Sequence, residues 1–354
     1  MAKLGWNSQL MASFFKKEPS YNAGVTMNAT NACTLVGFSN ESAEWDDKLV
    51  NDREEFTGKE HGYDQEIVEK GLKMTLSFPK AKPNDLIGLA ALALGSVATT
   101  QDGAFTAYKH KMVPVAVGTA LPSIQVNEKR GGVQQYAYKG VGCNSLKISG
   151  KSGEMVSVEG ELVGSGDRSE AATAFPASIT ESWLKVNQMS GWMENAGTIS
   201  IAATLTQAAQ NISSGTPRDI KAAIESFEIG YNNNLDQNRG FGGAALLQSL
   251  DYTRRMVDLK FTARFDAKDD LDYYLSQTVY AFELDLKGAL IAAGGAMYYG
   301  AQIVIPRFKL KKAPLPKGGP GDILKADFEC EVFEDGTNPA IIIEGYNAVP
   351  AYLA

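Results

Sequence analysis

Cysteine and histidine are scarce in this sequence. Its 354 residues include three cysteines, Cys33, Cys143 and Cys330, and two histidines, His61 and His110. Three widely separated cysteines do not make a disulfide framework, and no pair has the Cys-x-x-Cys spacing of a metal site. A zinc site or a histidine-dependent triad would have to recruit nearly all of these residues. We therefore expect three buried thiols and two histidines that lie in surface or hydrogen-bonded loops.

Long apolar runs and excess positive charge are also lacking. No stretch reaches the roughly 18 consecutive apolar residues of a membrane span. The first ten residues are polar and lack the charged-then-apolar order of a signal peptide, so we expect a cytosolic product with no membrane partner. The formal net charge is −7 and the pI is about 5.1. The average surface therefore repels phosphates, which disfavours binding of DNA through basic patches.

Two short motifs suggest ligand binding, but each has a simpler interpretation. Gly150-Lys151-Ser152 resembles the end of a phosphate-binding loop, yet the glycine needed five residues earlier is Ser145. We interpret this motif as a hairpin turn. The acidic run Asp266–Asp272 lacks the glycine and the glutamate of a calcium loop. Acidic residues near the positive end of a helix dipole explain this run better.

Paired carboxylates are the remaining candidates for catalysis. Glu159 with Glu161, and Glu329 with Glu331, are spaced by two residues, so each pair shares one face of a strand. Two such acids could serve a glycosidase as acid and base. A solvated strand face predicts the same residues without activity. The sequence therefore predicts no catalytic, cofactor-binding or metal-binding residue, no cofactor and no enzymatic activity.

Alternation of apolar and polar residues is the strongest pattern present. At 72–78 the sequence is Leu-Lys-Met-Thr-Leu-Ser-Phe, and the same template returns at 259–265 as Leu-Lys-Phe-Thr-Ala-Arg-Phe. A period of two places the apolar side chains on one face of a β-strand. The chain also has 35 glycines, which supply turns between strands. These features predict a mainly β fold with flanking helices.

The two templates belong to a longer series of ordered matches. Three further pairs follow the same order: Val36–Asn40 with Ile229–Asn233, Ser145–Ile148 with Arg307–Leu310, and Met155–Val163 with Leu324–Val332. Both templates continue into a polar turn, Lys82–Leu86 and Lys268–Leu271, whose Asn and Asp residues are candidate helix N-caps. The order of the matches predicts an internal duplication, with chance similarity of alternating strands as the alternative.

The duplication divides the chain into three predicted parts. Residues 1–30 are predicted to form an N-terminal extended arm, residues 31–165 a first copy with a long loop at 96–130, and residues 176–354 a second copy. The small, polar stretch between the copies has the composition of a linker. The second copy carries its own long turn at Ala313–Gly321, where proline and glycine oppose regular structure.

Five ordered segments resemble phage tail tube proteins, the major tail proteins of viruses with long, non-contractile tails. The segments are Tyr136–Leu146, Gly160–Gly164, Phe227–Leu235, Arg255–Leu259 and Ile305–Arg307. They are spread from residue 136 to residue 307. Their most distinctive parts are the Gly-Cys pair at 142–143 and the Asn-Asn turn that follows 231.

The resemblance implies a tail tube β-sandwich whose strands close into a multi-subunit β-barrel. Subunits would form rings, and the rings would stack into a tube whose acidic lumen passes DNA and the tape-measure protein without specific DNA binding. With two copies per chain, three subunits would make a trimeric, pseudo-hexameric ring; a hexameric ring is the alternative. The other implied partners are the tail terminator and distal tail proteins. The implied location is the virion tail, after assembly in the host cytoplasm.

Open sheet edges give an independent reason to expect polymerisation, because unpaired edges are templates for further pairing. The loop at 96–130, the arm at 1–30 and the C-terminal tail near Pro350 are candidates for contact between rings. Other readings stay open: a tube of a contractile tail or secretion apparatus, a β-sandwich binding or adhesion module, another virion structural protein, or an enzyme. A binding module would be expected to show a signal peptide or an exposed aromatic cluster.

Overall fold

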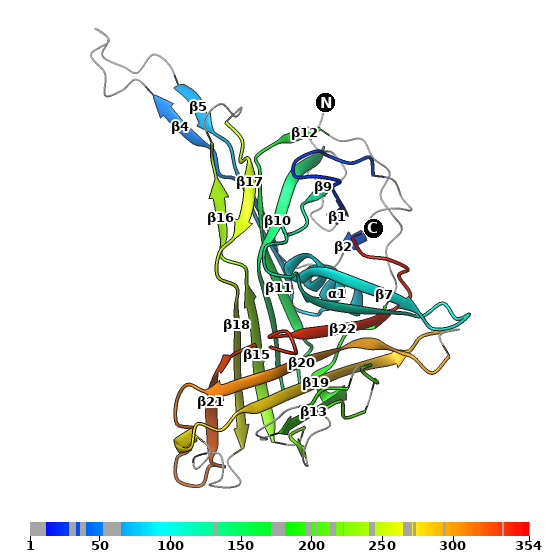
Figure 1. The fold of residues 1–354 in the computed structure, drawn as a ribbon, viewed down its shortest axis with the longest axis vertical. Coiled ribbons are helices and arrows are strands. Elements are labelled where there is room, and N and C mark those ends of the chain that lie inside the picture. The colour runs from blue at the N-terminus through cyan, green and yellow to red at the C-terminus, as the bar shows by residue number, and fades with distance from the viewer. Residues whose placement is uncertain are drawn as a thin grey trace, which may run out of the picture.

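The computed structural model is mainly β, as predicted, with one α-helix in the part of the chain that it describes (Figure 1). The described residues are 12–27, 33–35, 40–51, 65–130, 134–170, 181–194, 200–202, 204–207, 209–212, 217–221, 223–240, 245–264, 271, 274–292, 295–334 and 336–353. Within these residues, no helix is both long enough and apolar enough to span a membrane.

The strands pair antiparallel throughout. The elements are β1 (Ala12–Lys17), β2 (Cys33–Leu35), β3 (Asn40–Trp45), β4 (Lys48–Asn51), β5 (Gln65–Glu69), β6 (Leu72–Phe78), α1 (Pro83–Leu94), β7 (Gly95–Gln101), β8 (Tyr108–Pro114), β9 (Ile124–Arg130), β10 (Gln134–Lys151), β11 (Ser157–Gly164), β12 (Arg168–Glu170), a 3-10 turn (Val186–Gln188), β13 (Met189–Glu194), β14 (Arg218–Asp219), β15 (Ile224–Asn232), β16 (Leu235–Asn238), β17 (Ser249–Tyr252), β18 (Met256–Arg264), β19 (Tyr280–Leu290), β20 (Tyr298–Leu310), β21 (Lys325–Val332) and β22 (Ile342–Asn347).

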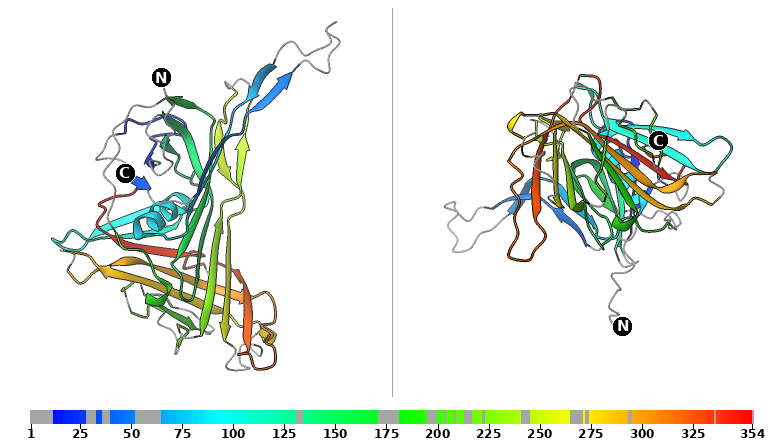
Figure 2. Two further views of the ribbon diagram at one scale, coloured as in Figure 1. Left: turned by 180° about the vertical axis from the view of Figure 1, so that it is seen from behind. Right: turned by 90° about the horizontal axis from the view of Figure 1, so that it is seen from below.

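A long sheet runs along the molecule in the strand order β3-β6-β11-β10-β15-β18-β21-β20 (Figures 1 and 2). β20 joins it only at Phe308–Leu310. The predicted strands at 72–78 and 259–265 lie in this sheet as β6 and the second part of β18, which ends at Arg264; residue 265 lies outside the described residues. In both, the apolar residues are buried and the polar residues face outward, as the period of two requires.

A second sheet crosses the long one and shares β20 with it. Its strand order is β7-β8-β22-β20-β19-β13-β14. β10 is also shared between two sheets. Its first part pairs with β9, and its second part pairs with β11 and β15 of the long sheet. β9 in turn pairs with β1, which pairs with β2. Two long strands, β10 and β20, therefore carry the chain from one sheet into another.

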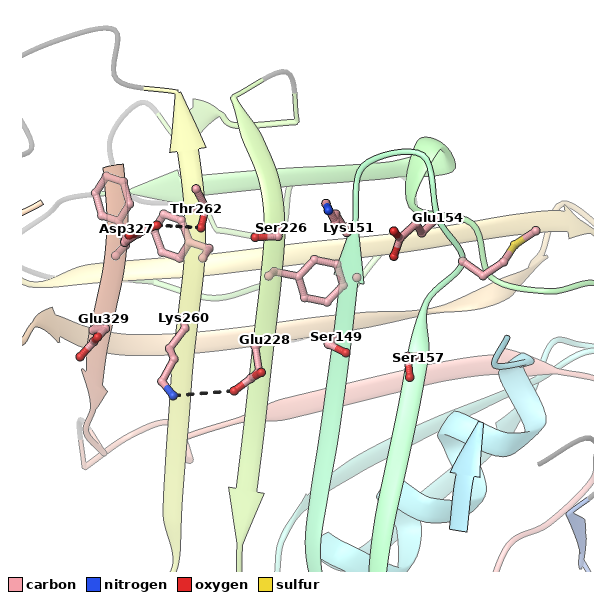
Figure 3. A pocket seen from close by; sticks show the side chains of 15 residues that line it. Ser149, Lys151, Glu154, Ser157, Ser226, Glu228, Lys260, Thr262, Asp327 and Glu329 are labelled. Atoms are coloured by element: carbon pink, nitrogen blue, oxygen red, sulfur yellow. Dashed lines mark hydrogen bonds and ion pairs between the residues drawn. The ribbon is translucent and has the colours of Figure 1, made fainter. Parts of the chain in front are cut away.

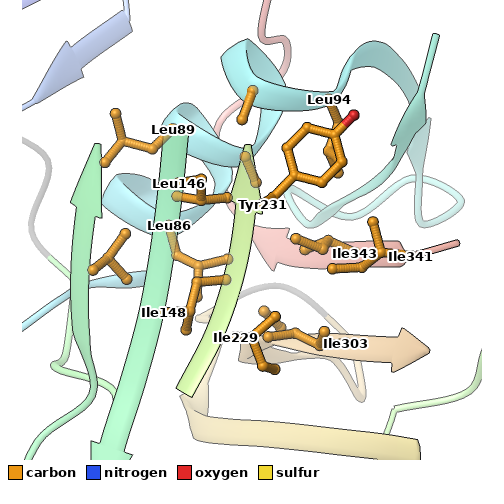
Figure 4. Packing of buried hydrophobic residues seen from close by; sticks show 14 of the residues in the cluster. Leu86, Leu89, Leu94, Leu146, Ile148, Ile229, Tyr231, Ile303, Ile341 and Ile343 are labelled. Atoms are coloured by element: carbon orange, nitrogen blue, oxygen red, sulfur yellow. The ribbon is translucent and has the colours of Figure 1, made fainter. Parts of the chain in front are cut away.

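Helix α1 fills the space between the long sheet and the second sheet (Figure 4). Pro83 starts it, where a missing N–H costs nothing, and Gly95 ends it with a left-handed φ of 79°. The candidate N-caps Asn84 and Asp85 are not the N-cap, which is Lys82; Asp85 instead accepts the Lys82 N–H at 3.1 Å. Every residue of α1 is buried, and after Asn84 and Asp85 in its first turn the helix is apolar on all sides, as an enclosed helix should be.

Glycines on both sheets let α1 approach closely. A Cβ atom added to Gly160 of β11 would lie 2.9 Å from Leu89 Cδ2, and one added to Gly345 of β22 would overlap Ile87. The core around α1 combines Leu146 and other apolar residues of the long sheet with residues of the second sheet (Figure 4). Because one helix packs on both sheets, the two halves of the chain share one core.

Two of the predicted segments are wrong in part. The long loop at 96–130 contains β7, β8 and β9. These strands are polar and gain stability by pairing with β22 and β1, which are distant in sequence, so no local signal identifies them. Within the predicted arm at 1–30, β1 pairs with β9, and Phe15 is buried in the core. Residues 1–11 and 28–32 lie outside the described residues.

The C-terminal tail folds back onto its own subunit. Tyr352 is buried, and its hydroxyl donates to Asn84 Oδ1 at 2.7 Å and accepts from Asn347 Nδ2 at 2.7 Å. Asn347 Oδ1 also lies 3.1 Å from Nε2 of His110, a buried side chain. Through Tyr352, the C-terminal tail is therefore packed against its own subunit.

The close approach of α1 to β22 predicts the cost of adding one methyl group. Gly345→Ala should lower the free energy of unfolding by about 1–3 kcal/mol, because Ile87 has to move out of a packed core. Gly230→Ala is the matched control: its Cβ would meet only Asp258 Cβ, at 3.7 Å. Urea unfolding of unassembled subunits measures both. Equal stability of the two variants would contradict the packing described here.

A buried carboxyl at the start of α1 predicts a pH dependence. Burial, together with a smaller contribution from the nearby Glu181 charge, raises the pKa of Asp85 from 3.8 to about 7. The folded chain therefore binds an extra proton between these pH values, and its stability falls as the pH rises through them. Asp85→Asn keeps an acceptor for the Lys82 N–H but does not titrate.

We compare the free energy of unfolding of Asp85→Asn with that of the wild type at each pH. The value for the variant minus the value for the wild type should increase by at least about 1.4 kcal/mol from pH 4 to pH 8, which is the equivalent of one pKa unit. Asp327→Asn provides a nearly flat control, because Lys317 and Thr262 lower the pKa of Asp327 from 3.8 and its titration therefore lies below this pH range. Urea unfolding at several pH values measures both variants. A difference between Asp85→Asn and wild type that does not change with pH would refute the assignment.

Candidate functional site

The outward face of the long sheet is polar across seven strands, in the order β3-β6-β11-β10-β15-β18-β21. The cross-strand register aligns its side chains in rows. One row passes through Ser77, Glu159, Lys147, Gly230 and Asp258, each directly opposite the next. Neighbouring rows are built in the same way, so the polar side chains form one continuous surface (Figure 3). We call it the polar face.

Charges of both signs alternate on the polar face, and acidic residues outnumber basic ones. The acidic residues are Glu44, Glu159, Glu161, Glu228, Asp258, Asp327, Glu329 and Glu331, and the basic residues are Lys73, Lys147, Lys151, Lys260, Arg264 and Lys325. The face is therefore strongly hydrated and slightly negative.

Ion pairs link neighbouring strands across the polar face. Glu228 of β15 lies 2.7 Å from Lys147 Nζ of β10. It also lies 3.7 Å from Lys260 Nζ of β18, and Figure 3 shows this second pair. The Lys147 contact lowers the pKa of Glu228, and Lys260 contributes as well. Lys312 lowers the pKa of Glu329 in the same way. Because these pairs are exposed, solvent screens them and each contributes little to stability.

This electrostatic pattern argues against hydrolysis of a glycosidic bond. A hollow of about 450 Å³ lies between β10, β15, β18 and β21 and includes Glu228, Asp327 and Glu329. The pKa of each of these three carboxyls is lowered, whereas a glycosidase acid needs a raised pKa to stay protonated. The four acids singled out from the sequence, Glu159, Glu161, Glu329 and Glu331, are spread over β11 and β21 of the polar face.

The other sequence motifs have structural roles where they are described. Gly150-Lys151-Ser152 lies at the turn from β10 to β11, which confirms the hairpin interpretation. Cys143 and Cys330 are buried free thiols, as expected. His110 is hydrogen-bonded, to Thr99 at 2.9 Å, but it is buried in β8 and not in a loop. His61 lies outside the described residues, as does most of the acidic run at 266–272.

A cluster of buried polar residues on the second sheet was not predicted from the sequence. Glu283 accepts the backbone N–H groups of Asn211 and Ile212, at 2.8 and 3.1 Å, and the Asn211 side chain at 2.6 Å. Burial raises the pKa of Glu283. Nearby, Glu344 forms a buried ion pair with Lys109 at 2.7 Å. These carboxylates hold the segment around Asn211 on the sheet, so their role is structural.

Within the described residues, no group of three or more His, Cys, Asp or Glu side chains could hold a metal ion. The geometry thus presents an extended polar surface in place of a pocket with converging catalytic groups. A family model described as phage tail tube protein matches residues 49–332. The chain belongs to the phage tail tube protein family. No curated protein gives a significant match.

Membership confirms the resemblance drawn from the five ordered segments and assigns this tail tube protein to a structural, non-enzymatic family. The matched region includes β6, α1 and every later strand of the polar face. It is a structural subunit of the phage tail, and its place is in the virion.

Proposed function

We propose that this tail tube protein polymerises into stacked rings and that the polar face lines the lumen. The observation that carries this proposal is a four-strand order that occurs twice in one sheet, β3-β6-β11-β10 and then β15-β18-β21-β20. A surface that is polar over its whole width suits the wall of a water-filled conduit. The buried opposite face supplies the wall with its stiffness.

The repeated order extends beyond the long sheet and supports two tandem copies, at 31–165 and 176–354, with β1 of the predicted arm at 1–30 added to the first. β10 is flanked by β9 and then β1, and β20 is flanked by β19 and then β13. In each set, the first two strands are joined through a two-stranded hairpin, β4–β5 in the first and β16–β17 in the second. Each copy therefore has the same succession of strands.

Two copies per chain favour a trimeric, pseudo-hexameric ring over a hexameric one, because three subunits then present six similar units. The ends of the long sheet support closure between subunits. Among the described residues, β3 pairs only with β6 and so leaves its second edge open. At the other end, β20 pairs with β21 over three residues only. Pairing across subunits would remove both edges and close the sheets into a barrel.

The charge of the polar face fits the passage of DNA. Its acidic excess repels phosphates at short range, and its many lysines prevent that repulsion from becoming strong. DNA and the tape-measure protein would therefore pass without specific binding. The tail terminator and distal tail proteins would cover the two ends of the tube, and assembly would take place in the host cytoplasm.

Negative-stain electron microscopy of the purified protein tests the proposed assembly. We expect hollow rings and tubes whose top views have threefold symmetry with six similar lobes. Six identical subunits per ring would reject the tandem copies and keep the tube. A monodisperse monomer at every concentration would reject polymerisation and favour the binding or adhesion module.

Gold labelling tests which surface lines the lumen. Ser149→Cys places a thiol at the centre of the polar face (Figure 3). Subunits labelled with maleimide-gold and then assembled should carry the gold inside the tube. Leu290→Cys is the control, because this exposed residue ends β19 at a distance from the long sheet (Figure 1). Gold from Ser149→Cys on the outer surface would contradict the orientation proposed here.

A further inference from the structure

A short segment that leads from the first set of strands to β13 packs against the chain just before α1. We call its residues, 181–185, the connector. The backbone N–H of Leu184 donates to Ala81 O at 2.9 Å, and Leu184 O accepts the Val156 N–H at 2.9 Å. The Leu184 side chain is buried in the core, whereas residues 182, 183 and 185 are exposed. A segment held by so few contacts can open locally at a lower free energy than the sheets around it.

Two carboxylates meet at the first turn of α1. Glu181 of the connector accepts the Asn84 N–H at 2.8 Å, and Asp85 of α1 accepts the Lys82 N–H at 3.1 Å. Asp85 is 2 % exposed, and Oε1 of Glu181 is buried. The free N–H groups at the start of a helix attract negative charge, which explains why both acids lie here. The two charges also repel each other, since the Glu181 charge opposes ionisation of Asp85.

The groups around this pair are a lysine and several neutral side chains. Lys82, the half-buried N-cap of α1, favours ionisation of both carboxyls, and the Asn347 side chain favours the charged form of Glu181. Burial raises the pKa of Tyr299 of β20 above its ordinary value of 10.0, and burial lowers the pKa of His110 of β8 to about 4. Tyr299 and His110 are therefore neutral near pH 7 and do not offset a carboxylate charge.

Asn84 links the same place to the C-terminal tail. Its backbone N–H donates to Glu181, and its side-chain oxygen accepts the Tyr352 hydroxyl at 2.7 Å. Asn347, the amide that acts on Glu181, also donates to the Tyr352 hydroxyl at 2.7 Å. Three parts of the chain that are distant in sequence thus meet at one pair of acids: the connector, the start of α1 and the end of β22 with the tail.

We propose that Glu181 and Asp85 form a proton-operated latch, which holds the connector on the start of α1 and opens when both carboxyls are ionised. Burial is the largest cause that raises the pKa of each carboxyl, from 4.5 for Glu181 and from 3.8 for Asp85, to about 7. The closed latch therefore binds protons that an open, hydrated one has already lost. The stability of closure is lost as the pH rises through about 7.

The latch acts on the join between the two sets of strands and leaves the sheets intact. The pairing of β10 with β15 involves no residue of the latch, so opening frees the connector while this pairing persists. The two sets of strands are then joined through the long sheet and the core alone. The proposal concerns a single subunit, so it does not depend on how subunits assemble.

Hydrogen exchange of the Leu184 and Val156 amides tests the latch, because both amides are bonded through the connector. Exchange is followed by mass spectrometry on peptides of the purified protein at pH 6 and pH 8, in one assembly state checked by electron microscopy. Protection factors correct for the intrinsic effect of pH on exchange. In the wild type, protection at these two amides should fall at least about tenfold from pH 6 to pH 8, the equivalent of one pKa unit. Protection within β10 should stay unchanged.

Two variants separate the latch from other effects of pH. Glu181→Gln keeps an acceptor for the Asn84 N–H but does not titrate, so protection of its connector should be equal at the two pH values. Asp85→Asn should remove the fall in the same way. Asp327→Asn makes the same acid-to-amide change on the exposed polar face and should behave like the wild type. If Glu181→Gln also loses protection in β10, it is misfolded, and Asp85→Asn decides in its place.

Three results would overturn the latch. The first is a wild-type connector whose protection is the same at pH 6 and pH 8. The second is a tenfold fall that persists in both Glu181→Gln and Asp85→Asn, because another group would then titrate. The third is an equal fall within β10, which would show that pH acts on the whole fold and not on the connector.

Discussion

The pairing of β10 with β15 is the constraint on which the rest of this structure depends. Seven residue pairs, from Ser145 with Asn232 to Lys151 with Ser226, join the first set of four strands to the second. On one face the junction carries the ion pair between Lys147 and Glu228. On the other face Leu146 and Ile148 lie under α1. A slip of one residue would turn Lys147 into the core, so burial of this face fixes the register.

The buried side of the sheet depends on one helix in the same way. α1 touches strands of both sheets, and it can do so because Gly160 and Gly345 leave room for Leu89 and Ile87. The chain end completes this enclosure, since Tyr352 closes over the start of the helix with hydrogen bonds to Asn84 and Asn347. The core therefore joins residues from the beginning, the middle and the end of the sequence, which makes the subunit a single body.

The long sheet has two ends that differ from each other and has open edges, and both features suit a subunit that assembles. The strands of the polar face end in a projecting hairpin on one side and a proline-rich loop on the other, so the two ends are unlike (Figure 2). Open edges in the long sheet would be a hazard for a protein that stays monomeric. In the assembly proposed above, these edges make the contacts between subunits.

The sequence by itself determined which residues share one face of a strand and which family the chain resembles. Alternation at 72–78 and 259–265 predicted the buried and exposed sides that β6 and β18 have, and the order of short segments predicted an internal duplication, because both signals are local. It did not identify β7, β8 and β9 in the region taken for a loop, or β1 in the region taken for an arm. It also placed an N-cap at Asn84 or Asp85, where the structure has Lys82. Only the tertiary structure decided that β10 pairs with β15, that Glu228 meets two lysines and that Glu283 holds a distant segment, because these contacts join residues whose separation in sequence leaves no periodic trace.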